Sequence, residues 1–165
     1  MYRGDQGVNR SYPLGVYATV FQAEVFAILM VAPSEEVRSC SGKNLVMCSD
    51  SQAVLKAVCA NRIRSNLVAE CADALGEMAE RNTVELVWVP GHSGIVGNEQ
   101  ADELARQGAE SAAMGPEPVL GIAREQINSA LNSWADEQLR EEWVAVEGCR
   151  QSKIMLMEPK PARTK

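Results

Sequence analysis

The stretch NLVMCSD, residues 44–50, decides the fold class of this 165-residue chain. It is a short apolar run after a Ser-Gly turn signal, which predicts a buried strand with Asp50 at its carboxyl end. A second strand, Thr83–Val89, is predicted from its β-branched residues. The residues between them favour two helices, one from Ser51 to about 60 and one from a Ser65 cap to about 81. The order strand, helix, helix, strand predicts a parallel pair and hence an α/β fold.

More elements are predicted on either side of this strand pair. Thr19 is followed three residues later by Gln22 at the start of an apolar run, which is the capping-box pattern and predicts a helix over residues 20–31. Downstream, Asn98 is expected to cap a helix that ends near residue 110. A rough alternation of polar and aromatic residues predicts one arm of a hairpin over residues 7–14. We therefore expect a mixed sheet flanked by helices.

Two parts of the chain differ in their patterns. We expect a compact domain over residues 1–111 and a C-terminal helical extension with a basic tail over residues 112–165. The stretch Met-Gly-Pro-Glu-Pro at 114–118 interrupts the helical pattern between them. The extension is predicted to contain an amphipathic helix that docks on the domain through apolar residues at positions i, i+4 and i+7, which are Ile127, Leu131 and Trp134.

The composition excludes several classes of protein. Five cysteines without a C-x-x-C pair indicate neither a disulfide framework nor a zinc site, which is typical of cytoplasmic or nuclear proteins. No apolar run is long enough to span a membrane and no secretory signal is evident, so we expect neither a membrane location nor secretion. The net charge of −6 argues against a broad basic surface for nucleic acid. Any such contact is expected to be local, with bound cations as one means of providing it.

Polar residues are expected to converge at one edge of the sheet. Asp50 follows the first strand, His92 lies in the Gly-bearing loop after the second, and Asp102 lies one turn into the next helix. The carboxyl ends of parallel strands are where α/β proteins form their sites. Glu24 stands among apolar residues of the first helix, where an acid needs a partner. Sites made of carboxylates and water suit hard cations such as Mg²⁺.

Each of these residues also has an ordinary structural explanation. Asp50 can act only as a helix cap. Glu99 and Asp102 can be acids near a helix start that complement the helix dipole. His92 can be a turn or surface histidine. If all these explanations hold, the chain is a generic α/β module without a metal site.

Four sequence blocks, taken together, distinguish between these explanations. In this order they resemble type 1 ribonuclease H over about residues 2–111. The tail from about residue 119, in particular GCRQSK (148–153), resembles the region that follows this domain in LINE-like, non-LTR retrotransposon polyproteins. Any one block is a weak signal, whereas the combination is specific. The blocks are FQAE (21–24), CSDSQ (48–52), VPGHSG (89–94) and GNEQADELA (97–105).

The resemblance implies a function and a set of site residues. It implies an endoribonuclease that hydrolyses the RNA strand of RNA·DNA hybrids, with two Mg²⁺ or Mn²⁺ ions in the intact family site. Glu24, Asp50 and Asp102 match three of the family's four metal-binding carboxylates. His92 matches its mobile-loop histidine, which assists water activation or product departure. All four residues are therefore expected to be catalytic.

Contacts with the hybrid are implied as well. Thr19 matches a position that contacts a DNA phosphate, Gln52 one that reaches into the minor groove, and Asn98 one that flanks the metal centre. RNA is distinguished from DNA by its 2′-hydroxyls, so we expect cleavage that tolerates many sequences. The expected partners are the RNA·DNA hybrid and a reverse transcriptase domain in a parent polyprotein. No small-molecule cofactor is expected.

One part of the family pattern is not found in this sequence. The family begins with a strand that carries a fourth acid in an Asp-Gly-Ser-like context, and we expect this chain to lack that strand. Asp5 is not assumed to replace the missing acid. We therefore expect little hydrolytic activity from the chain itself. The alternative function is a catalytically inactive remnant that binds nucleic acid or serves as a structural module.

Overall fold

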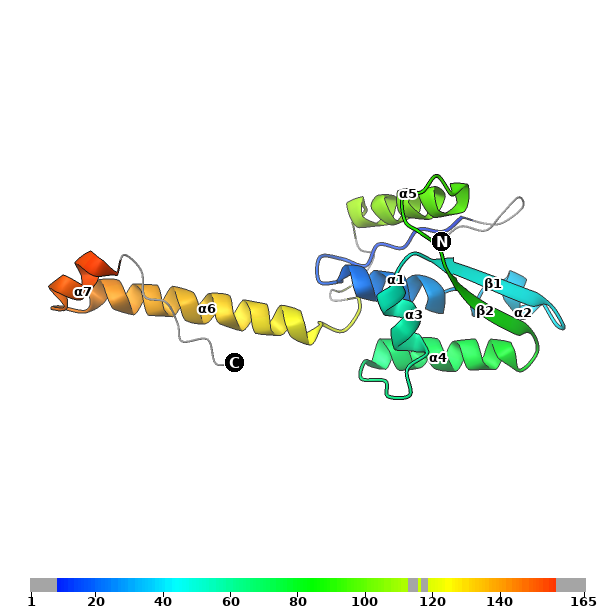
Figure 1. Cartoon of the computed structure of the whole chain (residues 1–165), viewed down its shortest axis with the longest axis horizontal. Helices are drawn as coiled ribbons and strands as arrows, with labels where there is room; N and C mark the ends of the chain where they lie inside the picture. The colour runs from blue at the N-terminus through cyan, green and yellow to red at the C-terminus, as the bar shows by residue number, and fades with distance from the viewer. Residues whose placement is uncertain (1–8, 113–115, 117–118, 157–165) are drawn as a thin grey trace. The chain divides into compact units, whose positions relative to one another are not determined.

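A computed structural model describes residues 9–112, 116 and 119–156 of the chain (Figure 1). The chain divides into two compact units, Met1–Gly121 and Ile122–Lys165, and each is described by itself. Asp5 lies outside the described residues, as does the predicted basic tail. The predicted domain boundary after residue 111 stays a prediction.

The sheet of the first unit consists, over the described ranges, of two parallel strands. β1 (Asn44–Ser49) pairs with β2 (Thr83–Trp88), and the register aligns Asn44 with Thr83 and Ser49 with Trp88. Both predicted strands and their parallel arrangement are confirmed, as is the α/β class. Because the two strands end at the same level, the residues that follow them emerge at one edge of the sheet.

Three helices of the first unit build its hydrophobic core against the strands. They are α1 (Val20–Leu29), α3 (Gln52–Val58) and α4 (Asn66–Ala79), whereas α2 (Glu35–Arg38) is a single turn. Residues of β1 alternate between exposed and shielded, so one face of the sheet packs on this helical layer. In Figure 1, α5 (Val96–Glu110) lies on the opposite side of the strands from α4. The buried apolar residues are Val25, Ile28, Val54, Val58, Val68, Cys71, Leu75 and Met78.

The start of α1 forms as its sequence predicts. The Gln22 backbone N–H donates to Thr19 Oγ1 at 3.2 Å, and the Thr19 N–H donates to Gln22 Oε1 at 3.0 Å. This reciprocal capping box is confirmed, and it satisfies two backbone donors that would otherwise lack partners. Gln22 Nε2 also donates to the Gly121 carbonyl at 2.6 Å, so the same side chain ties α1 to the end of the first unit.

Two predicted helix caps do not form. α4 begins at Asn66 as expected, but the Ser65 side chain makes no capping hydrogen bond. α5 begins at Val96, and Ile95 rather than Asn98 occupies the cap position. Asn98 already lies within the first turn, where its backbone N–H donates to the Ile95 carbonyl at 2.9 Å. Its side chain is therefore not used as a cap.

The predicted hairpin arm is also wrong for the residues of it that the structure describes. Residues 9–14 form no strand. Ser11 Oγ donates to a backbone carbonyl of α5 at 2.6 Å, and the Tyr12 ring meets Phe26 edge to face with centroids 5.6 Å apart. Gly108 permits this approach, because a Cβ there would lie 2.8 Å from Ser11 Oγ. The segment therefore packs on α1 and α5 instead of pairing in the sheet.

The second unit contains α6 (Arg124–Ala145) and α7 (Arg150–Met155). The predicted helix of the extension is present as α6, and docking of this helix on the first unit stays a prediction. Within the described part of the chain, no helix is both long and apolar enough to cross a membrane. Three apolar side chains of α6 are predicted to dock, and all three are exposed: Ile127, Leu131 and Trp134.

Candidate metal and nucleic-acid site

The candidate site lies at the edge where β1 and β2 end. Asp50 follows β1, and its backbone carbonyl accepts a hydrogen bond from Trp88 Nε1 at 3.0 Å. The loop after β2 approaches the Asp50 side chain at Gly91. A Cβ on Gly91 would lie 2.7 Å from Asp50 Oδ2, which is closer than Cβ atoms approach other groups. Any side chain at this position would therefore displace the carboxylate.

The Asp50 carboxylate also faces α5. Asn98 Nδ2 donates to Asp50 Oδ2 across 3.5 Å, a long and therefore weak hydrogen bond. Because Asn98 lies in the first turn of α5, this contact connects the helix start to the end of β1. The strand end, the loop after β2 and the start of α5 thus meet at Asp50.

Glu24 reaches the same edge from α1. Its Oε2 accepts a hydrogen bond from Ser49 Oγ at 3.3 Å, and Ser49 Oγ accepts one from the Ser51 N–H at 3.1 Å. Burial raises the pKa of Glu24, the charge of Asp50 raises it further, the Ser49 hydrogen bond lowers it, and the charge of Asp102 raises it. Asp50 and Asp102 are therefore each close enough to Glu24 to repel its negative charge. A bound cation relieves such repulsion.

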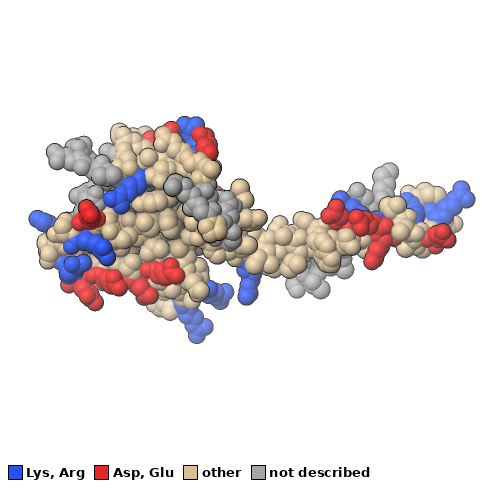
Figure 2. All heavy atoms as spheres, turned by 180° about the vertical axis from the view of Figure 1, so that it is seen from behind, with Lys and Arg blue, Asp and Glu red and all other residues tan. Residues whose placement is uncertain are grey.

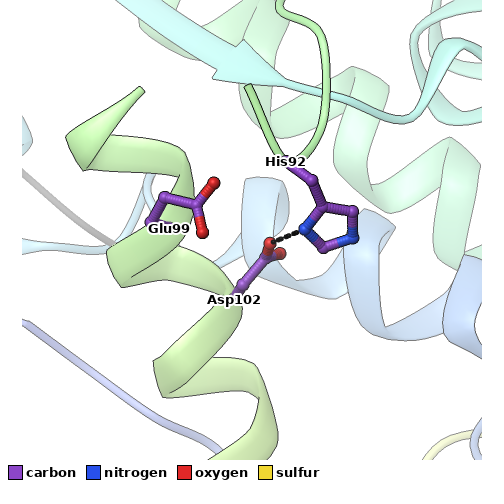
Figure 3. A group of neighbouring side chains, drawn as sticks. All are labelled: His92, Glu99 and Asp102. Carbon is purple, nitrogen blue, oxygen red and sulfur yellow. Dashed lines mark ion pairs between the residues drawn. The ribbon is translucent and has the colours of Figure 1, made fainter. Parts of the chain in front are cut away.

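A second group of side chains comes from the loop and from α5 (Figure 3). One possible ligand atom from each of His92, Glu99 and Asp102 lies within 4.8 Å of the other two. The ion pair drawn in Figure 3 joins His92 Nδ1 to Asp102 Oδ2 at 3.4 Å. Glu99 and Asp102 are three residues apart on α5, so both lie on one face of the helix. His92 has a φ of 50°, in the left-handed region that residues other than glycine rarely adopt.

The donor atoms at this edge fit a divalent cation. Asp102 Oδ2 is buried and has no hydrogen-bond partner among the residues that the structure describes. A buried carboxylate oxygen without a partner is costly unless a cation compensates it. Within the part of the chain that the structure describes, Glu24, Asp50 and Asp102 do not form a group whose oxygens all lie within 4.8 Å of one another. The predicted ligands thus gather at one edge without forming a single compact three-oxygen cage.

The residues predicted to contact the hybrid lie on separate elements. The Thr19 hydroxyl is engaged with Gln22 in the capping box. Gln52 is exposed as the first residue of α3. Asn98 contacts Asp50 from α5. The proposed contacts of these three residues with nucleic acid stay predictions.

Two residues that shape the site are missed by sequence reasoning. Gly91 leaves room for the Asp50 carboxylate, and Ser49 binds Glu24. A glycine in the loop directly after a strand can mark a close approach of the backbone to another group, and this is the signal by which Gly91 could be found. No comparable signal identifies Ser49, because its hydroxyl acts on a residue 25 positions away in the sequence.

Charged side chains are mixed in sign on the face of the molecule that Figure 2 shows. Lysine and arginine side chains lie next to groups of aspartate and glutamate side chains, and the described residues form no continuous basic surface on this face. Together with the net charge of −6, this pattern agrees with local rather than broad contact with nucleic acid.

Comparison with known proteins identifies one family. The family model described as RNase H matches residues 1–110. The chain is 58% identical to a Ribonuclease H of Aromatoleum aromaticum over 38 residues, which are 23% of this chain and 25% of that relative. It is 55% identical to a Ribonuclease H of Rhizobium etli over 42 residues (26% and 28%), and 47% identical to the Ribonuclease H1 of Mus musculus over 38 residues (23% and 13%). Each matched segment spans less than a third of the relative's length.

Proposed function

The chain belongs to the RNase H family, and from that premise we propose that it hydrolyses the RNA strand of RNA·DNA hybrids. The observation that carries the proposal is the meeting of three acids from separate elements, Glu24 of α1, Asp50 after β1 and Asp102 of α5. The charges of Asp50 and Asp102 both raise the pKa of Glu24, so the fold holds like charges together at an energetic cost. Perturbed acids of this kind cluster at functional sites.

Glu24, Asp50 and Asp102 are proposed to hold Mg²⁺ or Mn²⁺, with two ions in the complete site. When bound, such ions stabilise charge on the attacking water and on the leaving oxygen of the phosphodiester. Asp102 Oδ2 supports this role, because it lacks a hydrogen-bond partner within the described ranges. Gly91 leaves room for the Asp50 carboxylate at this edge, and Asn98 donates a weak hydrogen bond to it, so the carboxylate already faces the site without a ligand.

His92 is proposed to handle protons in this reaction. Its side chain is 86% exposed and lies beside Asp102. An imidazole can act as a general base or a general acid, so it can take a proton from the attacking water or give one to the leaving oxygen. Asp102 Oδ2, 3.4 Å from Nδ1, is placed to orient the ring and to stabilise its protonated form.

Recognition of the hybrid is proposed to be local and tolerant of sequence. Thr19 is assigned to a phosphate of the DNA strand, Gln52 to the minor groove, and Asn98 to the surroundings of the metal ions. The 2′-hydroxyls of the RNA strand allow this discrimination without contacts to base edges. We also propose that the chain derives from a LINE-like retrotransposon protein and works with a reverse transcriptase domain, which the resemblance of the tail from about residue 119 to such proteins supports.

Cleavage of a labelled RNA·DNA hybrid tests the proposal. The wild type is compared with Asp50→Asn and with the matched control Asp73→Asn, which removes the same charge from an exposed position on α4. We expect little cleavage by the chain itself. In the form that carries an added Asp-bearing strand, we expect Mg²⁺-dependent cleavage of the hybrid but not of an RNA·RNA duplex, with a loss of at least about 100-fold in Asp50→Asn only. Because the resemblance implies a fourth acid on a preceding strand, each variant is also assayed with an Asp-bearing strand added at its N-terminus.

The outcomes separate the proposal from its alternative. Equal cleavage by wild type and Asp50→Asn would contradict the assignment of the metal site. Binding of metal or hybrid without cleavage, in both the chain and its extended form, would instead support an inactive remnant.

A further inference from the structure

The exposed group of His92, Glu99 and Asp102 suits a different cation from Mg²⁺. One ligand atom from each residue lies within 4.8 Å of the other two. In Figure 3 the three side chains point into one space between the loop and α5. The group combines one imidazole nitrogen with two carboxylate oxygens. Imidazole suits transition metals such as zinc, whereas Mg²⁺ is bound almost entirely by oxygen.

An unsatisfied oxygen within this group points to a cation. Asp102 Oδ2 is buried without a hydrogen-bond partner among the described residues. His92 Nδ1 lies 3.4 Å from this oxygen, and a neutral imidazole presents either a hydrogen or a lone pair at that atom. Glu99 adds a second carboxylate to the same space. Positive charge is therefore favourable between the three side chains.

The helix that carries two of these residues has an opposing effect. Its N-terminus is the positive end of the helix dipole, equivalent to about half an elementary charge, which disfavours a nearby cation. This effect falls off within the first turn. Glu99 and Asp102 lie at and beyond the end of that turn, because α5 begins at Val96. Two full negative charges therefore outweigh the dipole at this position.

We propose that His92, Glu99 and Asp102 bind one borderline divalent transition-metal ion of the Zn²⁺ class, with water in the open position. Bonds in such sites are about 2.0–2.2 Å long, so the three side chains must close slightly around the ion. Side-chain rotation is sufficient for this closure, because His92 and Glu99 are both exposed. The site shares His92 and Asp102 with the proposed cleavage site, but its occupation does not depend on hybrid cleavage.

The single histidine of the chain gives this proposal a specific readout. Zn²⁺ is titrated into the full chain while the ring signals of His92 are followed by NMR, and Mg²⁺ is titrated in parallel. Cysteine thiolates are also Zn²⁺ ligands and the chain has five cysteines, so the ring signals rather than total bound zinc define occupancy. The test variant is Glu99→Gln. The matched control is Glu103→Gln, which removes the same charge from the same helix at a residue that pairs with Arg106 instead.

We expect a saturable change of the His92 ring signals with Zn²⁺ but not with Mg²⁺ at the same concentrations. The apparent affinity is expected to fall at least about tenfold in Glu99→Gln and to stay at the wild-type value in Glu103→Gln. Unchanged ring signals in Zn²⁺, an equal response to Mg²⁺, or equal responses of the two variants would each overturn the proposal. Every outcome is read without a cleavage assay, so it is independent of whether the proposed function holds.

Discussion

Two groups of ionisable side chains at the strand ends differ in burial and in donor atoms. The inner pair, Glu24 and Asp50, is partly buried and offers only oxygen. The outer triad, His92, Glu99 and Asp102, includes a nitrogen donor, and its histidine is 86% exposed. Contacts between elements far apart in the sequence position the inner pair, whereas the loop and one face of α5 position the outer triad.

This difference predicts two kinds of sensitivity to substitution. The inner pair depends on neighbours that carry no charge, since Ser49 binds Glu24 and Gly91 leaves room for Asp50. Changes to such neighbours are expected to disturb the inner pair. The outer triad is expected to respond mainly to changes in its own members, because exposed side chains can rotate to accommodate their surroundings.

Removal of the histidine from the outer triad is expected to have the largest effect on cleavage. General acid–base catalysis contributes about 100-fold or more to rates, so we expect His92→Ala, in the chain extended by an Asp-bearing strand, to lower kcat by at least about 100-fold. Hybrid affinity is expected to stay near the wild-type value, because the ring handles protons rather than holding the substrate. Single-turnover kinetics and a separate binding titration measure the two quantities. Weaker binding with unchanged turnover would assign His92 to positioning instead.

A substitution without charge tests the sensitivity of the inner pair. In Gly91→Ala the new Cβ would lie 2.7 Å from Asp50 Oδ2, so the carboxylate must move. A displacement of about 1 Å at a reacting centre costs up to about 100-fold, and we expect kcat/KM to fall about 10- to 100-fold. The control is Gly94→Ala, at a residue with open space around it but a φ of +75°. Equal losses in both variants would attribute the effect to backbone strain in the loop and not to Asp50.

The structure shows which features short-range patterns predict and which they do not. The capping box of Thr19 and Gln22 and both strands form as predicted, because neighbouring residues determine them. The predicted start of α5 at Asn98 is wrong. Ile95 occupies the cap position, and its apolar side chain gives no sequence signal of a cap. Residues 9–14 alternate like a strand, yet they pack on α1 and on α5, where the partner of Ser11 lies 93 residues away in the sequence.

The same distinction applies within the candidate site. Asp50 and the loop after β2 lie at one edge of the sheet, as expected for residues that follow the carboxyl ends of parallel strands. The contact between Ser49 and Glu24 depends on how α1 packs against β1, and no local pattern encodes that packing. The compact grouping of His92 with Glu99 and Asp102 likewise requires the backbone conformation at His92, whose φ of 50° is not predictable from residue type.

The smallest expected effect concerns the stability of the inner pair without metal. Burial and the charge of Asp50 raise the pKa of Glu24. The ionised carboxylate is therefore less favourable in the folded state than in the unfolded chain. With a chelator present at pH 7, we expect Glu24→Gln to raise Tm by a few degrees at most. The amide oxygen of the variant can still accept the hydrogen bond from Ser49.

The pH dependence of the rise in Tm in Glu24→Gln identifies the cause of that rise. Below the ordinary pKa of 4.5, Glu24 is protonated in both states, so the wild type carries no penalty and the variant has no advantage. As pH rises through the raised folded-state pKa, the wild type loses stability relative to Glu24→Gln, and the Tm difference grows to a plateau. Glu77→Gln, with the same charge change at an exposed position of α4, is the reference for reading this profile. Mg²⁺ is expected to reverse the order at pH 7, because ions held by the inner pair stabilise the wild type by mass action. An advantage of Glu24→Gln that Mg²⁺ leaves unchanged would count against Glu24 as a metal ligand.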